Sequence, residues 1–210
     1  MLVTYLFDPL CGWCYGAVPV VKRLATLDNV TVELAPSGLF AGEGARLMDA
    51  KFATYAWQND QRVARLSGQQ FTDAYRARIL EKTGGMFDSA PATLGIVAAG
   101  LTEQAREIEA MKTLQNARYI DGRDKCDLSV VSDILEEAGF SEAARRVRAR
   151  DEALLSAYRQ RISAARSEMK SFGVNGVPAL IVEDKHGRRL LSSDALFGDF
   201  DTLAAQMRAA

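Results

Sequence analysis

The chain has 210 residues, of which 48% are hydrophobic and 25% are charged, enough for a folded protein with a sizeable core. Its 26 Lys and Arg residues nearly balance 27 Asp and Glu residues, and a net charge of -1 argues against an electrostatic surface for nucleic acid or membranes. No apolar run reaches the roughly 18 residues that cross a bilayer, and the first residues lack the pattern of a secretory leader, so we expect a cytoplasmic protein.

The first forty residues predict a strand, a helix and a second strand. Residues 3–7 form a short run of β-branched, apolar and aromatic residues typical of a buried strand, and Asp8 with Pro9 ends it. From about Gly12 the apolar positions recur at helical spacing, and residues 30–35 alternate like a strand.

The middle of the chain predicts only helices. From about residue 45 to residue 172, apolar residues keep helical spacing and no segment has the pattern of a strand. After Gly173 the strand pattern returns at residues 179–182 and 189–192, which predict a hairpin, and residues 200–207 predict a closing helix.

This order of elements predicts an α/β fold in which a large all-helical insertion separates a β-α-β half from a β-β-α half. We expect one domain to comprise residues 1–40 and 173–210, joined by part of a helix over 151–172. The helical insertion domain is expected over residues 45–150.

Cys11 and Cys14 form a Cys-X-X-Cys motif where the first strand meets the first helix. One such pair in a cytoplasmic protein indicates redox or metal chemistry rather than a disulfide framework. The N-terminus of a helix favours a thiolate, which is the nucleophile of disulfide exchange, so we expect Cys11 to attack and Cys14 to resolve. A zinc site needs about four ligands and would require the fold to bring Cys126 and His186 to the pair.

Further candidate site residues flank this motif. Val177-Pro178 directly precedes a predicted strand, which makes it a candidate cis peptide bond that would face the cysteines and present the Val177 backbone to an extended substrate. Trp13, between the two cysteines, is expected to contact the substrate at the helix tip. Asp8, three residues before Cys11, could accept a proton during exchange, although a loop carboxylate is more often a turn residue.

The segment Cys11-Gly-Trp-Cys14, the helix residue Pro19 and the segment Gly173-Val-Asn-Gly-Val-Pro178 together resemble the thioredoxin-like superfamily. The helical block, with Leu114-Gln-Asn-Ala-Arg-Tyr119, is similar to the domain that interrupts this fold in its DsbA-type branch. The opening segment from Phe7 to Gly16 resembles cytoplasmic DsbA-related disulfide isomerases. The resemblance implies a thioredoxin-like fold, a redox-active pair at Cys11 and Cys14, and a cis-proline at Pro178.

The residues between the cysteines depart from part of this branch. Its exported oxidants carry a histidine there, whereas this chain has Gly12 and Trp13. Without a positive charge beside the thiolate, we expect a less oxidising couple than theirs.

These features favour a thiol–disulfide oxidoreductase or isomerase that acts on cysteine-containing proteins or small disulfides, with a cellular thiol as reductant and no bound cofactor or metal. The same branch includes kappa-class glutathione transferases and chromene-carboxylate isomerases, which typically have serine where this chain has Cys11 and lack the second cysteine. That similarity makes a glutathione-dependent transferase or isomerase the first alternative and glutathione a candidate co-substrate. A non-enzymatic binding module is the second, and the sequence leaves open a monomer or a homodimer.

Overall fold

A four-stranded sheet brings the two ends of the chain together in the computed structural model, which describes residues 1–82 and 84–208. Its strands are β1 (Leu2–Phe7), β2 (Thr31–Pro36), β5 (Ala179–Asp184) and β6 (Gly187–Leu191), in the order β2-β1-β5-β6. β1 pairs in parallel with β2, while β5 is antiparallel to both β1 and β6. The β-α-β and β-β-α halves therefore share one sheet, as predicted.

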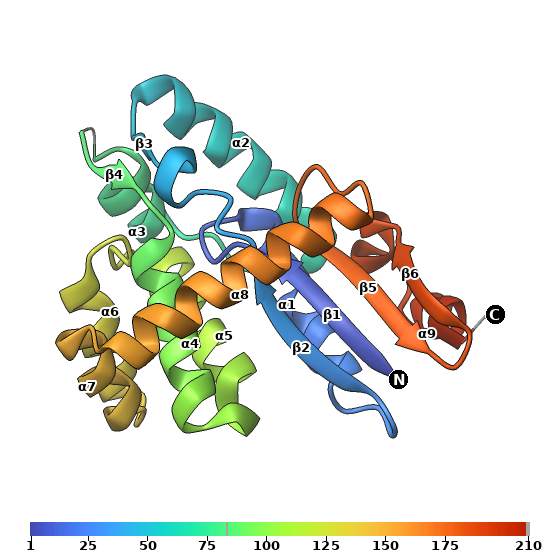
Figure 1. Ribbon diagram of the computed structural model, residues 1–210. Coiled ribbons are helices and arrows are strands. Elements are labelled where there is room, and N and C mark those ends of the chain that lie inside the picture. The colour runs from blue at the N-terminus through green and yellow to red at the C-terminus, as the bar shows by residue number, and fades with distance from the viewer. Residues whose placement is uncertain (83, 209–210) are drawn as a thin grey trace.

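Helices cover both faces of this sheet and form a block beside it (Figure 1). The helices are α1 (Gly12–Leu24), α2 (Ala50–Ser67), α3 (Asp73–Tyr75), α4 (Ala90–Thr102), α5 (Glu107–Tyr119), α6 (Leu128–Glu137), α7 (Ser141–Ala149), α8 (Glu152–Ser171) and α9 (Phe200–Arg208). Short 3-10 turns lie at Gly42–Gly44, Gln104–Arg106 and Ser193–Phe197, and a π-helical turn spans Arg76–Leu80. In the part of the chain that the structure describes, no helix is long and apolar enough to cross a bilayer.

The alternation of β1 directs its side chains to two different layers. Tyr5 and Phe7 are fully buried in the main core, which also takes in α1 and α9. Leu6 points to the other face and packs with Ala165 of α8 and Ile181 of β5. α8 crosses this second face of the sheet in Figure 1, opposite α1.

Two arginines of α8 fix it to the end of β2. Arg161 donates a hydrogen bond to the carbonyl of Leu34. Arg166 donates from Nε to the carbonyl of Ser37 at 3.1 Å and from Nη2 to that of Gly38 at 2.9 Å. The chain leaves the sheet after β2 and returns to it through α8, so these hydrogen bonds join the two ends of the helical block.

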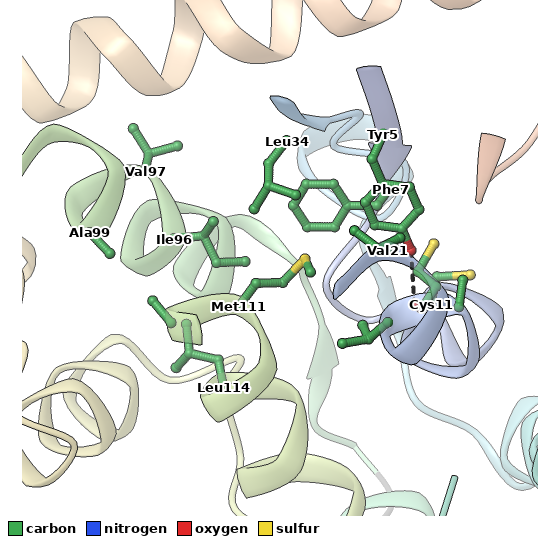
Figure 2. Close-up of a cluster of buried hydrophobic side chains, with 14 of the residues drawn as sticks. Tyr5, Phe7, Cys11, Val21, Leu34, Ile96, Val97, Ala99, Met111 and Leu114 are labelled. Atoms are coloured by element: carbon green, nitrogen blue, oxygen red, sulfur yellow. Dashed lines mark hydrogen bonds between the residues drawn. The ribbon is translucent and has the colours of Figure 1, made fainter. Parts of the chain in front are cut away.

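The main hydrophobic core is continuous from the helical block to the sheet. The labelled side chains in Figure 2 belong to one buried cluster. They come from β1, the N-cap of α1, α1 itself, β2, α4 and α5: Tyr5, Phe7, Cys11, Val21, Leu34, Ile96, Val97, Ala99, Met111 and Leu114. Because one core spans both parts of the chain, the boundaries between a sheet domain and an insertion domain remain a prediction.

The expected fold class is confirmed, but one expectation about the middle of the chain was wrong. β3 (Arg46–Leu47) and β4 (Met86–Phe87) form a small antiparallel pair where only helices were predicted. Each strand is two residues long, too short to show an alternating pattern in sequence.

Candidate active site

The two cysteines lie where β1 gives way to α1. Cys11 occupies the N-cap position of α1, and its extended backbone (φ -79°, ψ 119°) leads directly into the helix at Gly12. No side chain caps this terminus, so the free N–H groups and the helix dipole favour negative charge beside Cys11.

The two sulfur atoms differ in exposure and surroundings. Cys11 keeps 8% of its surface exposed, whereas Cys14 is fully buried. The Cys14 Sγ atom lies 3.5 Å from the backbone nitrogen of Asp8, and the Cys14 carbonyl accepts a hydrogen bond of 2.9 Å from the Tyr5 hydroxyl. Burial, reinforced by the neighbouring Cys11 thiol, raises the pKa of Cys14 well above its ordinary value. Cys11 is therefore the thiol that an external disulfide can reach.

The segment before β5 approaches Cys11 as the sequence predicted. The peptide bond between Val177 and Pro178 is cis. The Cys11 Sγ atom lies 3.5 Å from the Val177 carbonyl oxygen, although 166 residues separate the two positions in the chain. The fold thus brings both ends of the chain to a single thiol.

A cavity of about 570 Å³ opens beside this segment. Its lining includes Trp13, the backbone around Val177 and the hydroxyl-bearing turn at Ser193. The Trp13 ring meets the Phe197 ring edge to face, with 5.2 Å between centroids. Trp13 is partly buried and lines this cavity, and its expected contact with the substrate stays a prediction.

Asp8 lies in the interior of the protein and not at a surface turn. Its side chain is fully buried and accepts hydrogen bonds from the backbone of Leu10 at 2.9 Å, the backbone of Phe40 at 3.1 Å and the Ser89 hydroxyl at 2.8 Å. Burial raises the pKa of Asp8, and these three donors offset part of that shift. The carboxyl lies in the loop that carries Cys11 and is screened from solvent.

Two residues of the helical block donate hydrogen bonds to the loop before Cys11, and the sequence analysis did not identify either as part of the site. Lys125 is fully buried and donates a hydrogen bond of 2.6 Å from Nζ to the Pro9 carbonyl. The Tyr119 hydroxyl donates at 2.8 Å to the Leu10 carbonyl. Burial lowers the pKa of Lys125 well below its ordinary value, and repulsion from the charge of Arg118 lowers it further. The loop before the thiol is therefore fixed by side chains more than 100 residues away.

A second buried acid, Asp60 on α2, lies against the motif itself. It keeps only 5% of its surface exposed, and its Oδ2 atom accepts a hydrogen bond of 2.9 Å from the Tyr75 hydroxyl. Burial raises the pKa of Asp60 to about 7, even though Tyr75 and the charge of Arg118 act in the opposite direction. Nothing in the regular helical pattern of residues 50–67 marked this residue as part of the site.

The pKa of Asp60 predicts a pH-dependent contribution to folding. Between its ordinary pKa of 3.8 and the folded value of about 7, the folded chain holds a proton that the unfolded chain releases. The free energy of unfolding should therefore fall as pH rises through this window, by up to about 1.4 kcal/mol per pH unit. Urea unfolding of wild type and Asp60→Asn between pH 4 and pH 8 measures this, and the variant should gain stability relative to wild type as pH rises. A difference that stays constant with pH would contradict it.

The remaining candidates for a metal site lie apart. Cys126 is partly buried beside Arg118, with 4.0 Å between Sγ and Nη1, and His186 lies exposed in the turn between β5 and β6. Within residues 1–82 and 84–208, no group of three or more His, Cys, Asp or Glu side chains is placed to hold a metal ion. All three cysteines are free thiols.

Comparisons with known proteins show the family and the fold of the chain. The family model of the DSBA-like thioredoxin domain matches residues 2–207. Two structures of the cytosolic disulfide reductase DsbM from Pseudomonas aeruginosa, one of them with GSH, are 27% identical over the full length of both chains, with TM-scores of 0.86 and 0.85.

More distant structures share the fold. A candidate protein disulfide isomerase from Nitrosomonas europaea is 24% identical over 98% of each chain, with a TM-score of 0.76. A 2-hydroxychromene-2-carboxylate isomerase is 18% identical over 99% of this chain and 94% of its own, with a TM-score of 0.63. A search of curated protein sequences gives no match.

Proposed function

Because the chain belongs to the DSBA-like thioredoxin domain family, we propose that it is a thiol–disulfide oxidoreductase whose reactive pair is Cys11 and Cys14. The observation that carries this proposal is the position of the Cys11 sulfur at the N-terminus of α1, 3.5 Å from the Val177 carbonyl and next to a cavity. The dithiol supplies both electrons, so no bound cofactor is required.

The reaction begins at Cys11. Its thiolate attacks one sulfur of a substrate disulfide, which forms a mixed disulfide and releases the first substrate thiolate. The Cys14 sulfur then attacks the Cys11 sulfur and releases the second substrate thiolate. The substrate has gained two electrons, and the enzyme is left with a Cys11–Cys14 disulfide. Two molecules of a cellular thiol return it to the dithiol by the same exchange in the opposite direction.

The second step needs a proton acceptor, because burial keeps the Cys14 thiol protonated near neutral pH. We assign this role to Asp8, whose backbone nitrogen lies 3.5 Å from the Cys14 sulfur and whose carboxyl is buried in the loop before α1. A carboxyl with a raised pKa is better matched to a thiol than an ordinary aspartate is, which favours proton transfer between them.

We propose glutathione as the small thiol that enters the cavity. The cavity, of about 570 Å³, falls within the usual range for small-molecule sites. Its lining residues include Val177, Ser193 and Asp194, and an aspartate carboxylate suits a peptide that carries an ammonium group. The DsbM relative, described as cytosolic, has a structure with GSH, and we propose the cytoplasm as the compartment here as well.

Titration of the dithiol against glutathione buffers, followed by tryptophan fluorescence, tests the proposal. For a reductase we expect a reversible two-electron couple near that of thioredoxin, about -270 mV. A value near -120 mV would indicate an oxidant and contradict the proposed direction. If no reversible couple appears, the exchange function itself is wrong.

A glutathione-dependent transferase or isomerase is the alternative, and the shared fold of the chromene-carboxylate isomerase keeps it open. The two functions differ in their need for Cys14. An exchange enzyme should lose turnover in Cys14→Ser, whereas a transferase that uses only one activated sulfur should keep its activity. A glutathione conjugation assay with wild type and Cys14→Ser separates them.

A further inference from the structure

The glycine of the Cys-Gly-Trp-Cys motif faces a buried carboxylate. A Cβ atom on Gly12 would lie 2.1 Å from the Asp60 Oδ1 atom and 3.3 Å from its Cγ atom. Any side chain at this position would displace the carboxyl group. Asp60 therefore approaches the backbone at the N-terminus of α1, the same place where the Cys11 thiolate would gain stabilisation.

The polar groups around Asp60 come from two other helices and from the motif. Tyr75 of α3 donates the hydrogen bond to Oδ2. Arg118 of α5 is buried, and its guanidinium lies 5.5 Å from the Tyr75 ring centroid. Tyr119, also of α5, is close enough for the charges of both Asp60 and Cys11 to act on it. Asp60 is thus a desolvated carboxyl group packed against Gly12, the residue that follows Cys11.

We propose that Asp60 sets the redox equilibrium of the Cys11–Cys14 pair: its ionised carboxylate competes with the Cys11 thiolate for the same helix terminus and so favours the disulfide form. This inference rests on the proposed exchange function and gives it a direction. When the Cys11 thiolate is destabilised, the dithiol form of the enzyme gives up its electrons more readily, and this property suits a reductase. Asp60 lies against Gly12 and would act on the Cys11 sulfur through the helix terminus, so it is a positioning residue.

The ionisation of Asp60 falls in the range where such an effect can be measured. Burial raises its pKa to about 7, so its charge changes between pH 6 and pH 8. A group whose charge stays the same over this range would leave the alkylation profile of Cys11 with the shape of a single titration. Asp60 should instead flatten the rise of Cys11 reactivity with pH.

Asp60→Asn in the full chain tests this, with Asp73→Asn as the matched control, since Asp73 is an exposed carboxylate on α3. Alkylation of Cys11 by iodoacetamide is followed by peptide mass spectrometry from pH 6 to pH 9, and the redox equilibrium with glutathione is measured at pH 8. Asp60→Asn should alkylate several-fold faster at pH 8, with a steeper pH profile. Its equilibrium should shift up to about tenfold toward the dithiol, which is about 30 mV. Asp73→Asn should match wild type.

Tyr75→Phe supplies a second readout that keeps the carboxylate. The Tyr75 hydrogen bond lowers the pKa of Asp60, so its loss should move the flattened part of the alkylation profile to higher pH. If Asp60→Asn fails to fold, the alkylation profile of Tyr75→Phe tests the effect of Asp60 on Cys11. If folded variants show wild-type profiles and equilibrium, the inference about Asp60 is wrong while the exchange function stands. If wild type itself shows no reversible couple, the proposed exchange function is wrong. The alkylation profiles then still test the effect of Asp60 on Cys11.

Discussion

Cys11→Ser should abolish the reduction of a disulfide substrate, with a loss of turnover of at least about 1,000-fold. The Cys11 sulfur at the N-terminus of α1 is the proposed attacking atom, since Cys11 keeps 8% of its surface exposed and Cys14 keeps none. A serine hydroxyl is not ionised near neutral pH and cannot replace it. The buried Cys14 cannot replace it, because its sulfur has no exposed surface and burial raises its pKa. Reduction of a dithiol-linked fluorescent peptide or of glutathione disulfide measures the effect.

Cys14→Ser should fail at a different step. Cys11 still attacks, but no second thiol releases it, so the mixed disulfide accumulates and appears by mass spectrometry as a covalent adduct. Cys126→Ser is the control for the loss of a cysteine and should keep wild-type turnover. Undiminished turnover in Cys11→Ser, or release of product without an adduct in Cys14→Ser, would contradict the assigned roles.

Tyr119→Ala should produce the largest loss of stability among substitutions near the site, about 3–5 kcal/mol. The Tyr119 ring is buried and stacks on Tyr15 with 4.6 Å between centroids, and it meets Phe71 and Tyr75 edge to face at 5.0 Å each. Truncation leaves a cavity between these rings and removes the hydroxyl that holds the Leu10 carbonyl. Urea unfolding monitored by circular dichroism gives the free energy of unfolding.

Tyr119→Phe separates the ring from the hydroxyl. It keeps the aromatic packing and loses one buried hydrogen bond, so we expect a smaller cost of about 1–2 kcal/mol. Because that bond fixes the loop before Cys11, turnover should fall in this variant even under conditions where it is fully folded. Equal stability of Tyr119→Ala and Tyr119→Phe would show that the aromatic packing contributes little.

The elements that carry the reactive pair could be predicted from the sequence because their signals are local. Strands β1 and β5 are short apolar runs, and the switch to helical spacing at Gly12 marks the start of α1. The position of Val177-Pro178 directly before a predicted strand makes it a candidate cis peptide bond facing the pair, and the resemblance to the thioredoxin-like superfamily adds to that expectation. The cis peptide bond and the contact of Val177 with Cys11 agree with that expectation.

The buried polar side chains around the pair could not be predicted in the same way. Lys125 lies in a run of charged residues, Arg123-Asp-Lys-Cys-Asp127, that has the composition of an exposed loop. Asp60 occupies one position of an amphipathic helix in which acidic residues are usually solvated. Each is buried only because a partner distant in sequence accepts or donates its hydrogen bond, the Pro9 carbonyl for Lys125 and Tyr75 for Asp60. Such long-range pairing leaves no periodic signal.

The register of the sheet also has a consequence for how the protein forms during synthesis. Leu2 of β1 lies opposite Glu183 of β5, so β1 has no partner on that side until the ribosome has made β5, more than 170 residues after β1. The contacts among the helices of the insertion are closer in sequence and can form earlier. Through most of translation the Cys-X-X-Cys segment is therefore present without the Val177 carbonyl beside it. A nascent chain stalled before β5 should carry a reactive cysteine pair with no assembled site, and the emergence of the C-terminal hairpin completes the site.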